Sequence, residues 1–358
     1  MIGLWIGKTG EANAWYHITL TACPKACDFL HVVRHRPPVR EVDCTYIQYH
    51  TFKPGKGIKS FLKLFFLGWK VLKNNKIDFI ITFNVFPYGL ISYLLALLFD
   101  KKLVLAFIGA DFNTYFLKKY LSRRLISLAL KKSSVIVCKG KHMTKELVDH
   151  GVPEEKLFYY PHFVCNEMFE VPESSHYDYE IINISELIKR KRVNILLEAL
   201  RILKEKGILL RTCIVGDGPE LEFLKKKACE YDIQSLVAFV GFQKDVKSYL
   251  KRSKIYVQSS AGEGLSLSLL EAYCSGLVPI TTVAGSEKDI IKDGINGLFV
   301  AIDSPIDLSE KIELLMDDYN YDKMRKAILN DRNQYILDYA VSRFNDVLKH
   351  VMKEYGRD

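Results

Sequence analysis

The clearest pattern along the chain is an alternation of short apolar runs and amphipathic segments in its second half. Within 193–206, Leu196, Ala199, Leu200 and Leu203 recur at helical spacing, and the segment ends at Gly207. Further helices are predicted at 245–252, 266–275 and 287–292, and one that Pro219 opens. Strands are predicted at 179–185, 208–215, 237–241, 254–258, 277–282 and 297–300. This order predicts a parallel sheet with helices on both faces.

The first half repeats this rhythm less regularly. Strands are predicted at 79–82, 103–108 and 135–137, and helices at 58–74, 88–99, 122–130 and 141–150, whereas the first fifty residues give no clear pattern. The apolar segment 88–99 is shorter than the ~20 residues of a membrane span and is predicted to be a buried helix. Because 169–179 has the composition of a linker, we expect domains at 1–170 and 171–335. A last helix at 336–358 could pack back on the first domain.

Charge divides the two halves further. Of the net charge of +9, residues 1–170 carry 24 Lys and Arg against 13 Asp and Glu, and the remainder carries 27 against 29. An anionic partner of the first half is therefore expected, and nucleic acid, an anionic membrane and a phosphorylated acceptor all qualify. The segment 58–76, with Phe61, Phe65 and Trp69 among lysines, suits either a membrane surface or a core helix with a solvated basic side. The eight scattered cysteines lack zinc spacing and suit small buried side chains in a reducing compartment.

The loop that follows the predicted strand 254–258 carries the most informative chemistry. Small residues lead to a helix that begins near Ser266, where free backbone N–H groups suit a phosphate, and Gly264 permits close approach. Glu263 and Glu271 are separated by ~12 Å of helical rise, the order of a diphosphate. One carboxylate could hold a donor sugar and the other a ribose. The alternative is a surface loop with two solvated glutamates.

The stretch from Glu263 to Glu271 resembles the Glu-x7-Glu signature of retaining glycosyltransferases of family 4. The segments 214–220, with Gly216, and 239–242, with Gly241 and Phe242, are similar to that family's glycine turn and nucleobase-facing segment. Gly285 and the run 293–298 also follow its pattern, so the resemblance covers roughly residues 100–300. It implies an α/β GT-B fold, in which two Rossmann-like doubly wound parallel-sheet domains face a central cleft.

The resemblance also implies roles for individual residues. Lys191 falls on the family's diphosphate-binding lysine, but Glu186 occupies its arginine position, where neighbouring cations could compensate. In the segment 107–111, Ile108 replaces a histidine and Asp111 remains, unless it only caps a helix. The implied catalytic residues are Glu263, Lys191 and Asp111. The implied donor-binding residues are Glu271, Gly264, Leu265, Ser266, Arg190, Gly216, Gly241 and Phe242, and the implied acceptor-side residues are Gly7, Gly10 and Gly109.

By this resemblance the chain is expected to be a hexosyltransferase. It would move a sugar, with retention, from a UDP- or GDP-linked donor to a glycan or lipid-linked acceptor in cell-surface polysaccharide or glycolipid synthesis. No metal or other cofactor and no nucleic acid partner are expected. The expected location is the cytoplasm, at the inner face of the plasma membrane if the basic first domain contacts anionic lipid. Glu186 and Ile108 leave open a catalytically silent GT-B partner subunit, and a nucleotide-sugar epimerase is a further alternative.

Overall fold

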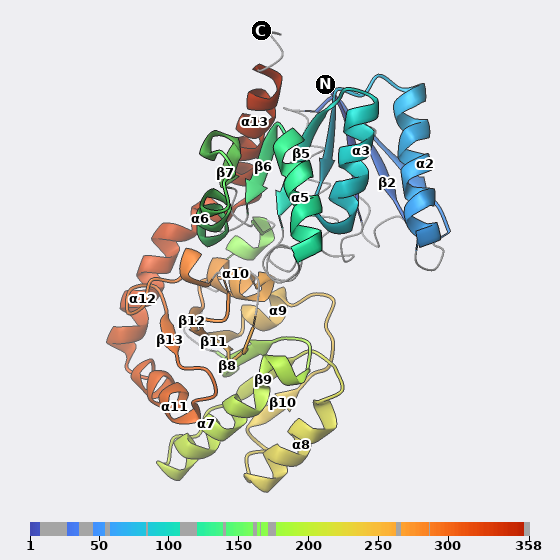
Figure 1. The fold of residues 1–358 in the computed structure, drawn as a ribbon. Helices are drawn as coiled ribbons and strands as arrows, with labels where there is room; N and C mark the ends of the chain where they lie inside the picture. The colour runs from blue at the N-terminus through green and yellow to red at the C-terminus, as the bar shows by residue number, and fades with distance from the viewer. Residues whose placement is uncertain are drawn as a thin grey trace. The chain divides into compact units, whose positions relative to one another are not determined.

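The chain divides into two compact units in the computed structural model (Figure 1). Unit 1 comprises residues 1–161 together with 340–358, and unit 2 comprises residues 162–339. The structure describes residues 1–7, 27–35, 46–53, 58–83, 85–107, 120–138, 141–159, 163–164, 166–170, 177–262, 266–285 and 287–353. Each unit has its own parallel sheet, as the alternating pattern predicts for an α/β chain of this length.

Unit 1 is built on a seven-stranded parallel sheet in the order β3-β2-β1-β4-β5-β6-β7. Its strands are β1 (Ile2–Ile6), β2 (Phe29–Arg34), β3 (Ile47–Thr51), β4 (Phe79–Thr82), β5 (Lys102–Phe107), β6 (Val135–Cys138) and β7 (Leu157–Tyr159). Its helices include α2 (Ile58–Asn74), α3 (Leu90–Leu98), α5 (Tyr120–Lys132), α6 (Lys141–Asp149) and α13 (Leu337–Lys353). From Ala340 onward α13 belongs to this unit, and the rings of Phe158 and His350 lie 4.9 Å apart.

Unit 2 is built on a six-stranded parallel sheet in the order β10-β9-β8-β11-β12-β13. Its strands are β8 (Tyr179–Ile184), β9 (Thr212–Val215), β10 (Val237–Phe239), β11 (Ser253–Gln258), β12 (Val278–Thr282) and β13 (Leu298–Val300). Its helices are α7 (Val193–Glu205), α8 (Leu221–Glu230), α9 (Lys247–Leu250), α10 (Leu267–Cys274), α11 (Pro305–Leu314) and α12 (Asp318–Asp331). Both sheets follow the strand order of a dinucleotide-binding fold, so the prediction of two Rossmann-like domains is confirmed.

Several predicted elements are shorter than expected. The helix predicted at 245–252 is only α9, the strand predicted at 208–215 begins at Thr212, and the helix predicted at 287–292 is a single turn, η6 (Glu287–Asp289). Pro219 precedes α8 rather than opening it, because the chain first passes through the turn at Gly218, whose φ is +155°. Strands β2 and β3 gave no signal in the sequence, since buried polar residues such as His31 and Arg34 interrupt the apolar pattern.

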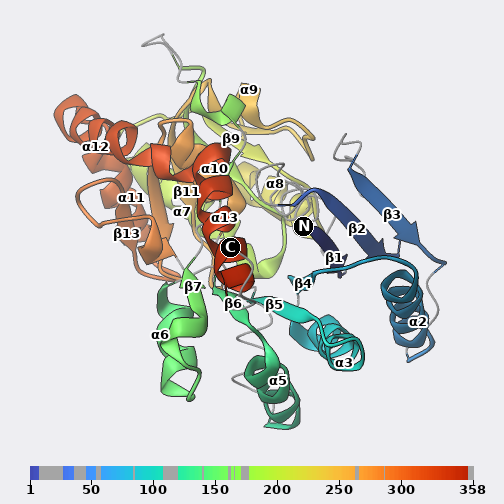
Figure 2. The same ribbon diagram turned by 90° about the horizontal axis from the view of Figure 1, so that it is seen from above.

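The apolar segment 88–99 differs from its prediction in a way that bears on function. It forms α3, which packs on α2 and α5, and Figure 2 shows the three helices side by side along one face of the sheet. Its inward residues Leu95 and Ala96 are fully buried, but Leu94, Leu97 and Leu98 are exposed. The prediction of a buried helix is therefore wrong for the outward side of α3. Within the described residues we find no helix whose length and apolarity would let it cross a membrane.

Candidate active site

The candidate site lies in unit 2, at the carboxyl ends of β8 and β11. These strands are hydrogen-bonded neighbours, with Tyr256 paired to Ile182, although α7, β9, α8, β10 and α9 separate them in the chain. From β8 the chain winds to one edge of the sheet, and from β11 it winds to the other. Parallel sheets bind ligands where the winding direction reverses, because the loops beyond the two strands part and leave a crevice.

A basic turn follows β8 at this point. It forms η5 (Lys189–Lys191), after which Arg192 adopts a left-handed conformation with φ of +52° and α7 begins. The loop beyond β11 holds the turn, because the backbone N–H of Ala261 donates to the Arg190 carbonyl oxygen at 2.9 Å. Ser259 Oγ likewise donates to the Arg192 carbonyl oxygen at 2.9 Å. The backbone of the basic turn is thereby fixed beside the first residues of the loop that follows β11.

A glycine turn supports the same edge from β9. A Cβ atom at Gly216, whose φ is +142°, would lie 1.8 Å from the carbonyl oxygen of Ser185. At Gly218 a Cβ atom would lie 2.5 Å from the carbonyl oxygen of Leu187. Only glycine fits such contacts, so the turn packs directly on the backbone that leads to the basic turn. The Gly216 N–H also donates to the carbonyl oxygen of Gly241 at 2.8 Å, and beside Gly241 the ring of Phe242 is 77% exposed.

The N-terminus of α10 is anchored to the end of β8. Ser266 caps the helix, with its Oγ accepting a hydrogen bond from the Leu269 N–H at 3.4 Å. Ser268 Oγ donates to the carbonyl oxygen of Ile184 at 3.0 Å and lies 3.0 Å from Ser266 Oγ. The positive end of the α10 dipole is therefore held at the same edge as the basic turn, an arrangement that favours an anion.

Glu271 lies in the second turn of α10. Burial raises the pKa of its carboxyl from 4.5 to about 7. Among the hydrogen bonds of the described residues, none reaches this carboxylate, although polar groups at this depth are normally paired. A desolvated acid with a raised pKa at the mouth of a parallel sheet is a functional candidate.

Glu287 is a residue that sequence reasoning did not find. Its side chain is fully buried, and its carboxylate accepts hydrogen bonds from the backbone N–H of Gly285 at 2.6 Å and of Ala284 at 3.2 Å. Gln258 Nε2 donates to it at 3.1 Å, which ties the loop after β12 to the end of β11. Glu287 therefore supports the site edge without belonging to the anion-binding turn. The only sequence signal was an acid two residues after the glycine that follows β12.

The structure brings together seven of the predicted site residues at this edge of unit 2: Lys191, Arg190, Ser266, Glu271, Gly216, Gly241 and Phe242. Gly7 directly follows β1 in unit 1. The side chain of Glu186, at the position where family 4 has an arginine, is exposed. The remaining predicted residues lie outside the described part of the chain: Glu263, Gly264, Leu265, Gly10, Gly109 and Asp111.

Comparison with known proteins gives matches over both units. The model of the group 1 glycosyl transferases matches residues 166–334, and that of glycosyl transferase 4-like proteins matches residues 27–140. A relative from Campylobacter jejuni is 27% identical over 296 residues, which cover 81% of this chain and 78% of the relative. Its name is GalNAc-alpha-(1->4)-GalNAc-alpha-(1->3)-diNAcBac-PP-undecaprenol alpha-1,4-N-acetyl-D-galactosaminyltransferase.

Two solved structures share the fold. HepE of Anabaena, in complex with UDP, has a TM-score of 0.77 at 14% identity over 97% of this chain and 99% of HepE. The lipopolysaccharide outer core galactosyltransferase WaaB, in its apo form, has a TM-score of 0.72 at 17% identity over 99% of this chain and 100% of WaaB. At these identities the likeness concerns the GT-B fold alone. The two family matches, which together span most of the chain, show that this chain is a glycosyltransferase and belongs to group 1 of these enzymes.

Proposed function

We propose that the chain is a retaining hexosyltransferase that uses a UDP- or GDP-linked sugar and a glycan or lipid-linked acceptor. The observation that carries this proposal is Glu271, a carboxyl with a raised pKa on a helix whose positive end lies beside a basic turn. A nucleoside diphosphate sugar offers hydroxyls for the acid and two phosphates for the cations and the helix end. In support, HepE binds UDP, and its structure with UDP and glucose is also known.

In the proposed complex, each part of the donor contacts a different group of residues at the carboxyl ends of the unit 2 strands. Glu271 accepts hydrogen bonds from the ribose hydroxyls, and Lys191 and the backbone of residues 264–266 hold the diphosphate. Glu263 would hold the sugar, and Gly241 and Phe242 would border the base. Charge develops on the diphosphate as its bond to the sugar breaks, so fixed cations at that position lower the barrier most. The acceptor hydroxyl attacks from the same face as the bond to the diphosphate breaks, and its proton passes to the departing diphosphate. Attack and departure on one face retain the configuration.

Glu186 does not contradict this proposal. Its side chain is exposed, where solvent and salt screen its charge, whereas Arg190 is fixed by a hydrogen bond to the Gly262 carbonyl oxygen. We propose that Arg190 supplies the charge that family 4 takes from its arginine, and that transfer needs no metal.

We further propose an acceptor side formed by Gly7, Gly10, Gly109 and Asp111, and a role in cell-surface polysaccharide or glycolipid synthesis. In support, the C. jejuni relative is named for transfer to a glycan on PP-undecaprenol, and WaaB is named a lipopolysaccharide outer core galactosyltransferase. The basic first half supports contact with anionic lipid at the inner membrane face.

Calorimetric titration with UDP and GDP, followed by donor hydrolysis assays, tests the site. We expect Lys191→Ala and Glu271→Gln each to weaken nucleotide binding and to slow turnover at least about tenfold, since each removes a charge-assisted contact of roughly 1.5–3 kcal/mol. The matched control, Lys226→Ala on the exposed side of α8, should bind and turn over normally. Near-normal rates in both site variants would refute the assignment. Tight nucleotide binding without turnover of any donor would instead favour the silent partner subunit.

A further inference from the structure

The outward side of α3 is unusual for a helix at a protein surface. The helix contains no charged residue, and Leu94, Leu97 and Leu98 on its outward side are 49%, 46% and 64% exposed. Helices that cover a sheet normally show polar residues to water, with their apolar side turned inward. An exposed apolar side of this kind marks a surface that binds a membrane or another protein.

The neighbouring helices extend this apolar surface and add positive charge. A Cβ atom at Gly68 of α2 would lie 2.8 Å from Leu95 Cδ1, so α2 and α3 approach closely. Leu62, Phe66 and Trp69 of α2 are exposed, as are Tyr120, Leu125 and Leu128 of α5. Across α2, α3 and α5 there is no Asp or Glu, whereas the lysines and arginines are Lys59, Lys63, Lys70, Lys73, Arg123, Arg124, Lys131 and Lys132. We call this surface the α2–α3–α5 face.

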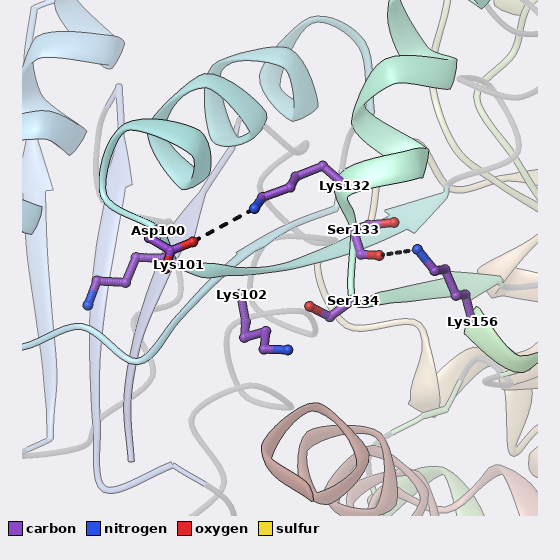
Figure 3. A pocket seen from close by; sticks show the side chains of 7 residues that line it. All are labelled: Asp100, Lys101, Lys102, Lys132, Ser133, Ser134 and Lys156. Carbon is purple, nitrogen blue, oxygen red and sulfur yellow. Dashed lines mark hydrogen bonds and ion pairs between the residues drawn. The ribbon is translucent and has the colours of Figure 1, made fainter. Parts of the chain in front are cut away.

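A cationic pocket adjoins the face where α3 and α5 end (Figure 3). Lys132 Nζ lies 3.8 Å from a carboxylate oxygen of Asp100, which joins the C-terminal ends of the two helices. The pocket has a volume of about 460 Å³, and four lysines line it together with Asp100, Ser133 and Ser134. These lysines are Lys101, Lys102, Lys132 and Lys156. Among the described residues that line the pocket, one is acidic and four are lysines, so the lining carries a net positive charge that suits an anionic group.

We propose that the α2–α3–α5 face docks on an anionic lipid bilayer and that the lysine pocket receives a lipid phosphate. The exposed leucines of α3 would enter the boundary between headgroups and acyl chains, and the surrounding cations would contact headgroups. Only the purpose of this docking, which is to bring unit 1 to a lipid-linked acceptor, depends on the proposed function.

The charge of the face argues against two other occupants. In a two-fold dimer the same surface meets itself, so the eight cations of the three helices would oppose eight others, and these helices themselves carry no acid to offset them. Nucleic acid would pair with the cations, but it would leave the α3 leucines facing phosphates and water. A bilayer with anionic headgroups satisfies both the leucines and the lysines.

Vesicle flotation of the full chain tests this proposal. Vesicles of phosphatidylcholine alone are compared with vesicles that contain about a third phosphatidylglycerol, at low and high salt. We expect binding to the anionic vesicles that weakens with salt. Leu97→Gln combined with Leu98→Gln should weaken binding at least about tenfold, and so should Lys101→Gln combined with Lys102→Gln, since each lysine near an anionic leaflet contributes about fivefold.

Matched variants in unit 2 serve as controls. Ile306→Gln with Leu314→Gln on α11 removes exposed apolar side chains, and Lys226→Gln with Lys323→Gln removes exposed charges. Both should float like the unaltered chain. Calorimetric binding of UDP and circular dichroism, measured on the same preparations, report the donor site and folding separately.

Each other outcome overturns a defined claim. A chain that binds UDP but no vesicles, or that binds neutral and anionic vesicles alike, contradicts the docking proposal and leaves the donor site standing. A chain that binds anionic vesicles but no nucleotide contradicts the proposed function alone. If only the lysine variant loses vesicle binding, the leucines do not insert into the bilayer. If the unaltered chain is a dimer and the leucine variant is a monomer, a second copy of the chain occupies the face.

Discussion

At the scale of single residues, the burial and the raised pKa of Glu271 are the main features of the candidate site. Its carboxyl is partly buried, and burial raises its pKa to about 7, so near neutral pH the acid is divided between its two protonation states. Desolvation disfavours the charged form, and hydroxyl donors from a ligand would favour it. The residue is therefore a poor contributor to stability and a good acceptor for a diol.

This gives a pH-dependent prediction for stability. Because the pKa is raised in the folded state, the stabilising contribution is complete below the ordinary value of 4.5 and is lost as pH rises through about 7. The loss reaches at most about 3 kcal/mol, and Glu271→Gln should remove it. Urea unfolding between pH 5 and 8 measures it, with Glu310→Gln on the exposed side of α11 as the control. A Glu271→Gln chain with the pH slope of the unaltered protein would contradict the burial argument.

The site residues that could be predicted are those that stand in a sequence pattern with a known chemical role. Lys191 and Ser266 stand in a cation run and at a helix start, and both lie at the predicted edge. Glu287 could not be predicted as a site residue, because an acid at this position is typical of the first turn of the helix predicted there. In the structure its carboxylate instead accepts hydrogen bonds from backbone N–H groups of the preceding loop. Only the fold reveals that this carboxylate is fully buried.

At the scale of elements, helices with strong hydrophobic periodicity were predicted accurately, whereas short strands with weak periodicity were missed. The helix predicted at 58–74 has those bounds in the structure, since its apolar positions recur through four turns. β7 is only three residues long and was not predicted, because it is too short to leave a pattern. The outward leucines of α3 were assigned to the interior, because hydrophobicity alone cannot tell a protein core from another apolar medium.

The glycine turn after β9 supplies a prediction at this scale. Gly216→Ala would force a Cβ atom to 1.8 Å from the Ser185 carbonyl oxygen, so the turn and the end of β8 must separate. We expect a loss of at least about 3 kcal/mol in unfolding free energy, together with weaker UDP binding. Gly207→Ala is the matched control, since Gly207 also has a positive φ of +80° but no heavy atom lies within 4 Å of the added Cβ.

The control should cost only about 1 kcal/mol, the penalty of the left-handed backbone, and it should leave UDP binding unchanged. Chemical denaturation and calorimetry of the two variants measure the difference. Equal losses in both would mean that backbone conformation, rather than contact between the turn and β8, sets the effect.

At the scale of the whole molecule, the sequence located the charge asymmetry but not its arrangement. The excess of cations in residues 1–170 was visible as a count, with three classes of partner equally open. Folding gathers eight of these cations with the exposed leucines on α2, α3 and α5, and this combination separates a lipid surface from nucleic acid. The parallel sheets, in contrast, followed from the alternating pattern, and their Rossmann-like architecture from the resemblance to family 4.

A further question at this scale is which groups stabilise the negative charge of the departing diphosphate. Enzymes that transfer phosphorylated groups often place a metal ion there, but in unit 2 the basic turn and the N-terminus of α10 are held at one edge by Ser259 and Ser268. Fixed cations and a helix end stabilise such charge without a metal. We therefore expect donor turnover to stay within about twofold when EDTA replaces added Mg²⁺, whereas Lys191→Ala lowers it at least about tenfold under both conditions. A loss of turnover in EDTA that Mg²⁺ restores would show that a metal, and not this turn, carries the charge of the leaving group.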